Sequence, residues 1–268
     1  MNNEIINITD YISKIQEIHQ LHMPKKNLFY RGVSKSKYDL KPKIFRDSAF
    51  KEKDVLLDYK HFLPRTAPMY DFPKDILKIL TDMQHYGIST RLLDWSMSPL
   101  TALYFACCNN LEVPHKDKEK TENDGKIYIL NSWKLWRRII PKSENADIHQ
   151  IHIQARALLA LYDFNEVKKR IKNEFDFEID ETDLQLPFPF VASFSNDRII
   201  AQKGCFTIHG TCIDELQGEE ITVMTILQPN KEKIMKELNM LGIDDYLIFP
   251  DYEGMTKSFN RKKSLFNL

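Results

Sequence analysis

The chain has 268 residues, and its 38 basic side chains balance its 38 acidic ones, so the formal net charge is zero. Hydrophobic residues make up 43% of the chain, which excludes general disorder, because disordered chains combine low hydrophobicity with high net charge. The balanced charge also argues against a protein that coats nucleic acid or an anionic membrane, and it leaves a local basic pocket open.

Several signals of compartment and cofactor are missing from the sequence. The polar N-terminus lacks the basic and apolar regions of a signal peptide, and no stretch approaches the roughly 18 apolar residues of a membrane span. The four cysteines form no CxxC pair, and the glycine patterns GxxxxGK[ST] and GxGxxG are absent. We therefore expect a cytoplasmic protein with reduced thiols, no metal and no membrane partner.

The first half of the chain is predicted to mix helices with short strands. Its elements are a helix from Thr9 and Asp10 along Ile12, Ile15, Ile18 and Leu21 to Pro24, a strand over 28–30 that stops at Gly32, helices over 52–63, 74–86 and 99–109, and a strand over 126–130 after a charged, solvated loop over 112–126. Pro73 and Gly87 mark the two ends of the second helix, and Ser98-Pro99 marks the start of the third.

The second half begins with a helix-rich section over 132–183 and then returns to strands. Its elements are helices over 148–162 and 165–175, strands over 190–194, 204–209 and 221–227, a helix over 231–240 that ends at Gly242, and a closing strand over 246–249. No regular βαβ alternation appears, so we expect an α+β fold with a mixed or antiparallel sheet flanked by helices. We expect one domain over 1–268, with its core in 27–131 and 187–254 and a helical insertion at 132–186.

The first candidate for function is Phe29-Tyr30-Arg31-Gly32, with Arg46 downstream. An arginine beside a glycine at a strand end presents its guanidinium where a ligand can approach closely. This group suits a phosphate or a carboxylate, because it stays charged and donates two parallel hydrogen bonds. Alternatively, Arg31 pairs with a structural carboxylate.

The second candidate is the polar stretch from Gln84 to Leu100. Arg91 and Asp94 are close enough to pair, Trp95 can stack on a base, and His85 titrates nearest to neutral pH and suits an acid or base role. Alternatively, the stretch is a structural turn tied by an Arg91–Asp94 bond, and the hydroxyl of Thr90 only caps a helix.

Two later segments also carry polar groups. Arg198 and Gln202 are four residues apart and would share one face of a helical turn. Asp251 and Glu253 follow the last predicted strand, in either a functional loop or a solvated turn. His149 is three residues before a second histidine, but no carboxylate-rich pattern supports a metal site there.

These segments resemble, in this order, the FRG domain family, which is named for a Phe-Arg-Gly motif. Here Tyr30 stands directly before the arginine of that motif. The stretch from Gln84 to Ala106 is similar to the central signature of the family almost residue for residue. Arg198, 202–206 and 241–251 look like its C-terminal pattern, so the resemblance spans about 28–253, apart from 132–183.

The resemblance implies a bacterial, phage-associated protein of the kind often found near defence or mobile elements, and it implies that the polar residues converge on one site. The catalytic candidates are Arg31, Arg91, Asp94, Gln202 and Glu253, and the ligand-binding candidates are Tyr30, Gly32, Gln84, His85, Tyr86, Thr90, Trp95, Ser193 and Arg198. The ligand expected there is a phosphorylated compound, a nucleotide or a nucleic acid.

Three functions remain open from the sequence. An ADP-ribosyltransferase-like enzyme would hold the phosphates of NAD with Arg31 and use Ser193 or Ser195, and Gln202 or Glu253, at the reacting ribose. A nucleic-acid-binding module would use four arginines, Arg31, Arg46, Arg91 and Arg198, with Tyr30, Tyr86 and Trp95 as stacking platforms. A sensor without catalysis, such as a recogniser of a phage component, would need only the pocket.

Overall fold

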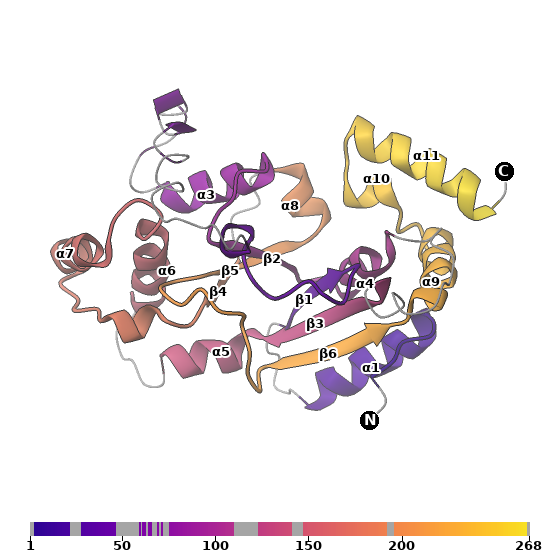
Figure 1. The fold of residues 1–268 in the computed structure, drawn as a ribbon, viewed down its shortest axis with the longest axis horizontal. Helices are drawn as coiled ribbons and strands as arrows, with labels where there is room; N and C mark the ends of the chain where they lie inside the picture. Colours follow the sequence, from indigo (N-terminus) through magenta and orange to yellow (C-terminus); the bar gives the residue numbers. More distant parts are fainter. Residues whose placement is uncertain are drawn as a thin grey trace.

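The computed structural model describes residues 3–21, 28–46, 59, 61–62, 64–65, 69, 71, 75–109, 123–140, 147–191 and 196–266. Its centre is a six-stranded antiparallel sheet in the order β4-β5-β2-β1-β3-β6 (Figure 1). The strands are β1 (Leu28–Val33), β2 (Leu92–Ser96), β3 (Gly125–Asn131), β4 (Phe188–Phe190), β5 (Gly204–Ile208) and β6 (Ile221–Ile226). The predicted α+β class is confirmed.

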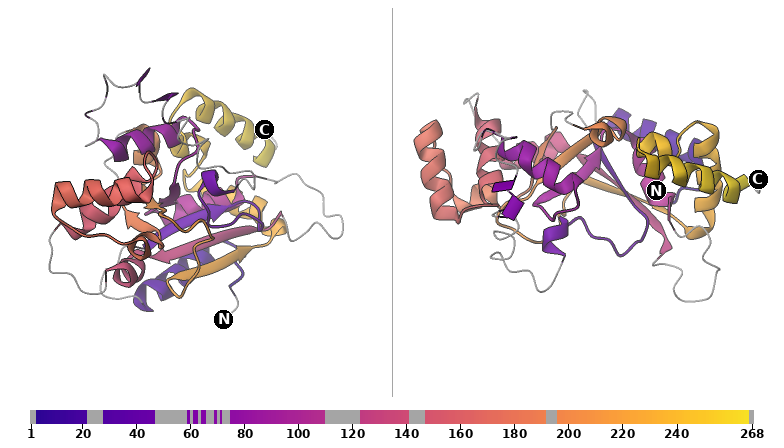
Figure 2. Two further views of the ribbon diagram at one scale, coloured as in Figure 1. Left: turned by 60° about the vertical axis from the view of Figure 1, so that its left-hand side comes forward. Right: turned by 90° about the horizontal axis from the view of Figure 1, so that it is seen from above.

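Helices surround this sheet and form most of the rest of the described chain. They are α1 (Ile8–Leu21), α3 (Ile76–His85), α4 (Pro99–Cys107), α5 (Ser132–Ile139), α6 (Ile148–Leu158), α7 (Phe164–Phe175), α8 (Asp197–Ala201), α9 (Gln228–Met240), α10 (Asp245–Ile248) and α11 (Tyr252–Phe266). Figure 2 shows α6 and α7 at one end of the long axis and α11 at the other. None of the described helices is long and apolar enough to cross a membrane.

The middle of the sheet is opened between β1 and β2. β1 pairs with β3 along its whole length, from Leu28↔Asn131 to Val33↔Lys126. β1 meets β2 at one paired position only, Tyr30↔Ser96, so the two strands separate beyond it. The sheet therefore has a gap at its centre, next to Arg31.

One face of the sheet carries two groups of helices. Helices α1, α4 and α9 pack over β1, β3 and β6, and helices α3, α6 and α7 pack over β2, β4 and β5. The opposite face is covered by a third cluster in which Leu93 and Trp95 pack with Leu135 of α5. The seam between the two helix groups lies above the gap between β1 and β2, which is where a cavity is expected.

Glycines bring α4 directly onto the sheet. A Cβ atom on Gly32 would lie 1.8 Å from the carbonyl oxygen of Ala102 and 2.7 Å from the backbone nitrogen of Ala106. Gly125 on β3 meets the carbonyl oxygen of Ala106 in the same way, at 2.4 Å. Gly32 thus lies inside β1, where it admits a helix. The prediction that it stops the strand is wrong.

The local end signals of two helices are confirmed. After α3, Gly87 has a φ of +84°, its N–H donates to Gln84, and the N–H of Ile88 donates to Met83, which together form a Schellman motif. At α4, the hydroxyl oxygen of Ser98 accepts the N–H of Thr101. The predicted strands over 204–209 and 221–227 and the helix over 231–240 are present, with ends shifted by one to three residues.

Other predicted elements differ from the structure. The closing strand over 246–249 is wrong, because Asp244 caps a helical turn there by accepting the N–H of Leu247. The first helix buries Ile8, Tyr11 and Ile15, so the predicted stripe through Ile12 and Leu21 is wrong as well. Of the strand predicted over 190–194, Phe190 is the last residue of β4, and 192–194 lie outside the described residues. Most of the helix predicted over 52–63 and of the loop predicted over 112–126 also lies outside them.

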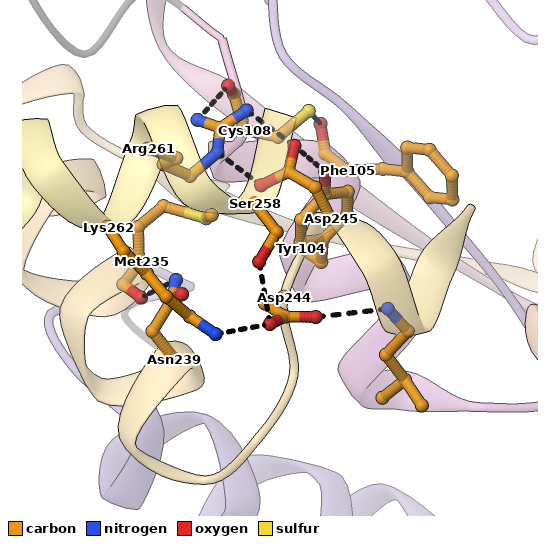
Figure 3. Close-up of polar contacts among 11 residues, drawn as sticks. Tyr104, Phe105, Cys108, Met235, Asn239, Asp244, Asp245, Ser258, Arg261 and Lys262 are labelled. Carbon is orange, nitrogen blue, oxygen red and sulfur yellow. Dashed lines mark hydrogen bonds and ion pairs between the residues drawn. The ribbon is translucent and has the colours of Figure 1, made fainter. Parts of the chain in front are cut away.

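A buried polar network anchors the C-terminal helices to α4 (Figure 3). Asp245 receives the Arg261 guanidinium at 2.6 Å and 2.9 Å, and the Tyr104 hydroxyl at 2.7 Å. Arg261 also donates to the carbonyl oxygen of Cys108 at 2.7 Å. These contacts join α4, α10 and α11 into one unit.

Candidate functional site

A cavity of about 440 Å³ lies at the seam between the two helix groups. Strands β1 and β2 form its floor, and α3, α4 and α8 form its walls. The charged and polar side chains that line it are Arg31, Lys43, Arg46, Thr81, Gln84, His85, Asp94, Ser96, Thr101, Arg198 and Gln202. Much of the predicted site is therefore brought together in one place by the opening of the sheet.

Arg31 of β1 lines this cavity. Its Nη1 donates to the backbone carbonyl of Asp94 at 2.6 Å, across the gap between β1 and β2. Its Nε is shielded from solvent and has no hydrogen-bond partner within the described residues. Burial lowers the pKa of Arg31 most, and nearby Arg46 lowers it further, whereas Asp94 and Tyr128 raise it. The guanidinium is thus partly desolvated, and its Nε lacks a partner among the described residues.

Two more cations stand at the cavity, on the 3-10 turn Lys43–Phe45 and just after it. Arg46 donates Nε to the carbonyl oxygen of Lys41 at 2.9 Å, and Lys43 donates to the carbonyl oxygen of Gly87 at 3.0 Å. Both side chains are exposed. Because Arg46 and Arg31 repel each other, an anion placed between them would relieve that repulsion.

Among the described residues that line the cavity, Asp94 is the one with a carboxylate. In β2 its side chain lies on the same face as that of Ser96, and it accepts Nε2 of Gln84 at 3.0 Å. Gln84 also donates to the carbonyl oxygen of Leu92 at 3.2 Å and accepts the Thr90 hydroxyl, so its amide is held in one orientation. Gln84 and Thr90 therefore position the carboxylate of Asp94.

Helix α8 supplies the opposite wall. Arg198 forms an ion pair with Asp251, with Nη2 and Oδ2 2.7 Å apart. Gln202 donates Nε2 to the carbonyl oxygen of Ile248 at 3.1 Å. The predicted common face of Arg198 and Gln202 is present, and both side chains line the cavity.

Arg91 is buried outside the lining of this cavity. Its Nη1 donates to the carbonyl oxygen of Gly210 at 2.6 Å, and its guanidinium lies 5.3 Å from the ring centre of Phe45. The predicted turn held by an Arg91–Asp94 bond is wrong, because Arg91 bonds Gly210 instead and Asp94 lies in strand β2, whose residues line the cavity.

Arg91 belongs to a buried basic cluster with Arg156, His152 and His209. Arg156 is fully buried and donates to the carbonyl oxygens of His152, Asp183 and Leu186. Burial, together with the positive charge of Arg156, lowers the pKa of His152 and of His209 to about 3. His149 lowers the pKa of His152 further, and Arg91 lowers that of His209 further. Both histidines are therefore neutral in the folded protein near pH 7.

This cluster predicts a loss of stability on acidification. The pKa of each histidine is 6.5 in the unfolded chain and about 3 in the folded protein. At a pH between these values, the unfolded chain therefore binds protons that the folded protein does not bind. As the pH drops through this range, the free energy of unfolding decreases by up to about 1.4 kcal/mol per pH unit for each histidine. Urea unfolding near pH 7 and pH 5 measures it. Between pH 7 and pH 5, the free energy of unfolding of His209→Gln should decrease by about 2 kcal/mol less than that of wild type. An unchanged pH dependence in this variant would contradict the assignment to His209.

The remaining predicted residues lie in varied places. Tyr30, Gly32 and Trp95 line the cavity. Tyr30 and Trp95 are nevertheless buried: the Tyr30 hydroxyl bonds His19, and the Trp95 indole donates to Thr207. Tyr86 is largely exposed beside His85. Glu253 forms an exposed ion pair with Lys257, outside the cavity lining. Ser193 and Ser195 lie outside the described residues.

The sequence did not point to several residues of the cavity. These are Lys43, Thr81, Ile88, Thr101, Phe105, Ile199 and Phe249. Lys43 is near Arg46 in a short basic stretch, which was the one signal available. The aromatic rings face the cavity because their elements meet there in space, and no local pattern records that. Within the described residues, no group of three or more His, Cys, Asp or Glu side chains is placed to hold a metal ion.

Comparison with known families gives one finding. Residues 26–115 match the family model of the FRG domain, which covers β1, α3, β2 and α4. Searches of curated proteins and of solved structures find no match. The match includes Arg31, Arg46, Gln84 and Asp94, whereas α8 with Arg198 lies outside it.

Proposed function

Because the chain carries an FRG domain, we propose that its central cavity binds a phosphorylated ligand of nucleotide size. The observation that carries this proposal is the guanidinium of Arg31, which is partly desolvated, repelled by Arg46 and left with an unpartnered Nε within the described residues. A half-buried cationic donor of this kind favours a multivalent anion, because phosphate oxygens accept several charge-assisted hydrogen bonds at once.

The size and lining of the cavity support a nucleotide over a bare phosphate. Its volume of about 440 Å³ lies in the ordinary range of small-molecule sites. The rings of Phe105 and Phe249 meet edge to face on the wall, with centres 6.0 Å apart. The cavity thus offers cations for a phosphate and an apolar wall for a base or another ring.

If the protein is an enzyme, the lining suits an NAD-dependent transfer of ADP-ribose. Arg31 would hold the phosphates. The bond between ribose and nicotinamide would break with its electron pair leaving on neutral nicotinamide, and an acceptor would bond to the ribose carbon while giving its proton to Asp94. Gln202 lines the cavity as the amide, with its Nε2 bonded to Ile248, whereas Glu253 does not line it. The alternative is a sensor, in which binding alone is the function, and the association of the family with phage defence accords with either role.

The nucleic-acid module is less favoured by the structure. Its stacking platforms were to be Tyr30, Tyr86 and Trp95, but Tyr30 and Trp95 are buried and only Tyr86 is exposed. Arg91, the third of its four arginines, is buried as well. A base could not stack on these side chains as they lie.

Calorimetry with ADP, NAD and adenosine tests the proposal. ADP or NAD should bind, adenosine should bind much more weakly, and Arg31→Gln should weaken the binding about tenfold or more, because it removes charge-assisted hydrogen bonds. Arg137→Gln, a matched change on the exposed face of α5, should leave the affinity unchanged. No binding of either phosphate compound, or equal affinity in Arg31→Gln, would contradict the proposal. Release of nicotinamide from NAD with candidate acceptors separates the enzyme from the sensor.

A further inference from the structure

Arg198 is a cation of the cavity wall that already forms an ion pair with a carboxylate of the protein. Asp251 receives its guanidinium through Oδ2, at 2.7 Å from Nη2 and 3.3 Å from Nε. The guanidinium also lies 5.4 Å from the ring centre of Phe249, another residue of the wall. Arg198 therefore differs from Arg31, which faces the cavity without a carboxylate partner in the described structure.

The same carboxylate of Asp251 holds the beginning of α11. Its Oδ1 accepts the N–H of Gly254 at 2.7 Å, and the backbone carbonyl of Asp251 accepts the N–H of Met255 at 2.9 Å. One oxygen thus holds a cavity cation and the other caps a helix. A displacement of Arg198 therefore acts, through the carboxylate of Asp251, on the cap at the first turn of α11.

Gln202 adds a second link between the cavity and the same segment. It shares the face of α8 with Arg198, and its side chain donates to the carbonyl oxygen of Ile248, the last residue of α10. Arg198 of α8 and Gln202, the residue that ends this helix, therefore both hold the segment 248–251, which joins α10 to α11. The C-terminal helices are coupled to the cavity at this point.

We propose that the Arg198–Asp251 pair is an autoinhibitory latch, which the anionic group of a ligand opens by taking the Arg198 guanidinium from Asp251. Opening the latch weakens the cap of α11 and makes the C-terminal helices a reporter of the occupied cavity. This inference rests on the proposed function and names the regulation of the same site.

The strength of the latch suits such an exchange. The side chains of Arg198 and Asp251 are each 36% exposed, and partly exposed ion pairs of this kind contribute little. A phosphate carries more charge and more acceptor atoms than one carboxylate, so it can compete for the guanidinium. Arg198 and the N–H of Gly254 hold the pKa of Asp251 below its usual range, so the carboxylate stays charged at neutral pH. The buried Asp245–Arg261 contacts keep the helices in place when the latch opens (Figure 3).

Asp251→Asn is the matched variant that isolates the latch. Asparagine is a good helix cap, so the bond to Gly254 can remain while the charge that holds Arg198 is removed. By calorimetry with inorganic pyrophosphate, Asp251→Asn should bind about two- to fivefold more tightly than wild type. Glu253→Gln removes one negative charge from the same turn without touching Arg198, and it should leave the affinity unchanged.

Amide hydrogen exchange gives a second readout of the same device. In wild type, saturating pyrophosphate should speed the exchange of the Gly254 and Met255 amides several-fold, and in Asp251→Asn it should change them little. Equal pyrophosphate affinity in wild type and Asp251→Asn, or an equal gain in Glu253→Gln, overturns the latch and leaves the proposed function standing. No binding of pyrophosphate, ADP or NAD to wild type or to either variant overturns both.

Discussion

Replacing Asp245 by alanine should lower the free energy of unfolding by about 3–5 kcal/mol. Asp245 is 1% exposed and accepts two hydrogen bonds from Arg261 and one from the Tyr104 hydroxyl. Without this carboxylate, the largely buried guanidinium of Arg261 keeps its charge but loses its counterion. The Tyr104 hydroxyl loses its acceptor in the same step, and a buried donor left without a partner is costly.

Urea unfolding followed by circular dichroism measures this loss. Glu232→Ala is the control, because it breaks an exposed ion pair with Lys236 on α9 and should cost about 0.5 kcal/mol or less. If Asp245→Ala does not fold, the double variant Asp245→Ala/Arg261→Met tests the same idea. It leaves no buried charge unpaired and should recover part of the loss. A cost of Asp245→Ala no greater than that of the control would contradict the prediction.

The sequence predicted best those features that are set by a few neighbouring residues. The Schellman motif at Gly87 and the cap at Ser98 each depend on contacts within five residues, and both are present. The run Tyr246 to Phe249 shows the limit of this reasoning. Four apolar residues fit a strand or a helical turn equally well, and the cap from Asp244 selects the helix.

The candidate site was predicted in its composition more than in its geometry. The stretch from Gln84 to Leu100 was expected to lie between two helices as a turn or a site, and it contains the central strand β2. Alternation along a strand places Asp94 and Trp95 on opposite faces of the sheet. Both residues line the cavity, but the indole of Trp95 is buried and donates to Thr207. Recognising the strand would have separated these two residues. The gap between β1 and β2, which makes the cavity, depends on long-range pairing that no local pattern reveals.

Gly32, the glycine of the Phe-Arg-Gly motif, gives a prediction that separates packing from ligand binding. Gly32→Ala should cost about 3 kcal/mol or more, because its Cβ would lie 1.8 Å from the carbonyl oxygen of Ala102 and α4 would have to move away from β1. Gly242→Ala is the control: its φ is +78° and nothing lies within 4 Å of the added Cβ, so only backbone strain of about 1–2 kcal/mol is expected.

Urea unfolding of the two variants provides the comparison, and calorimetry on the folded Gly32→Ala protein provides the second measurement. A glycine that serves a bound ligand would lower the affinity for ADP while leaving the stability close to that of Gly242→Ala. A glycine that admits α4 lowers the stability first, and it disturbs the cavity only as far as α4 shifts. Since α4 brings Thr101, Ala102 and Phe105 to the cavity wall, the packing of this one residue also sets the shape of the site that Arg31 faces.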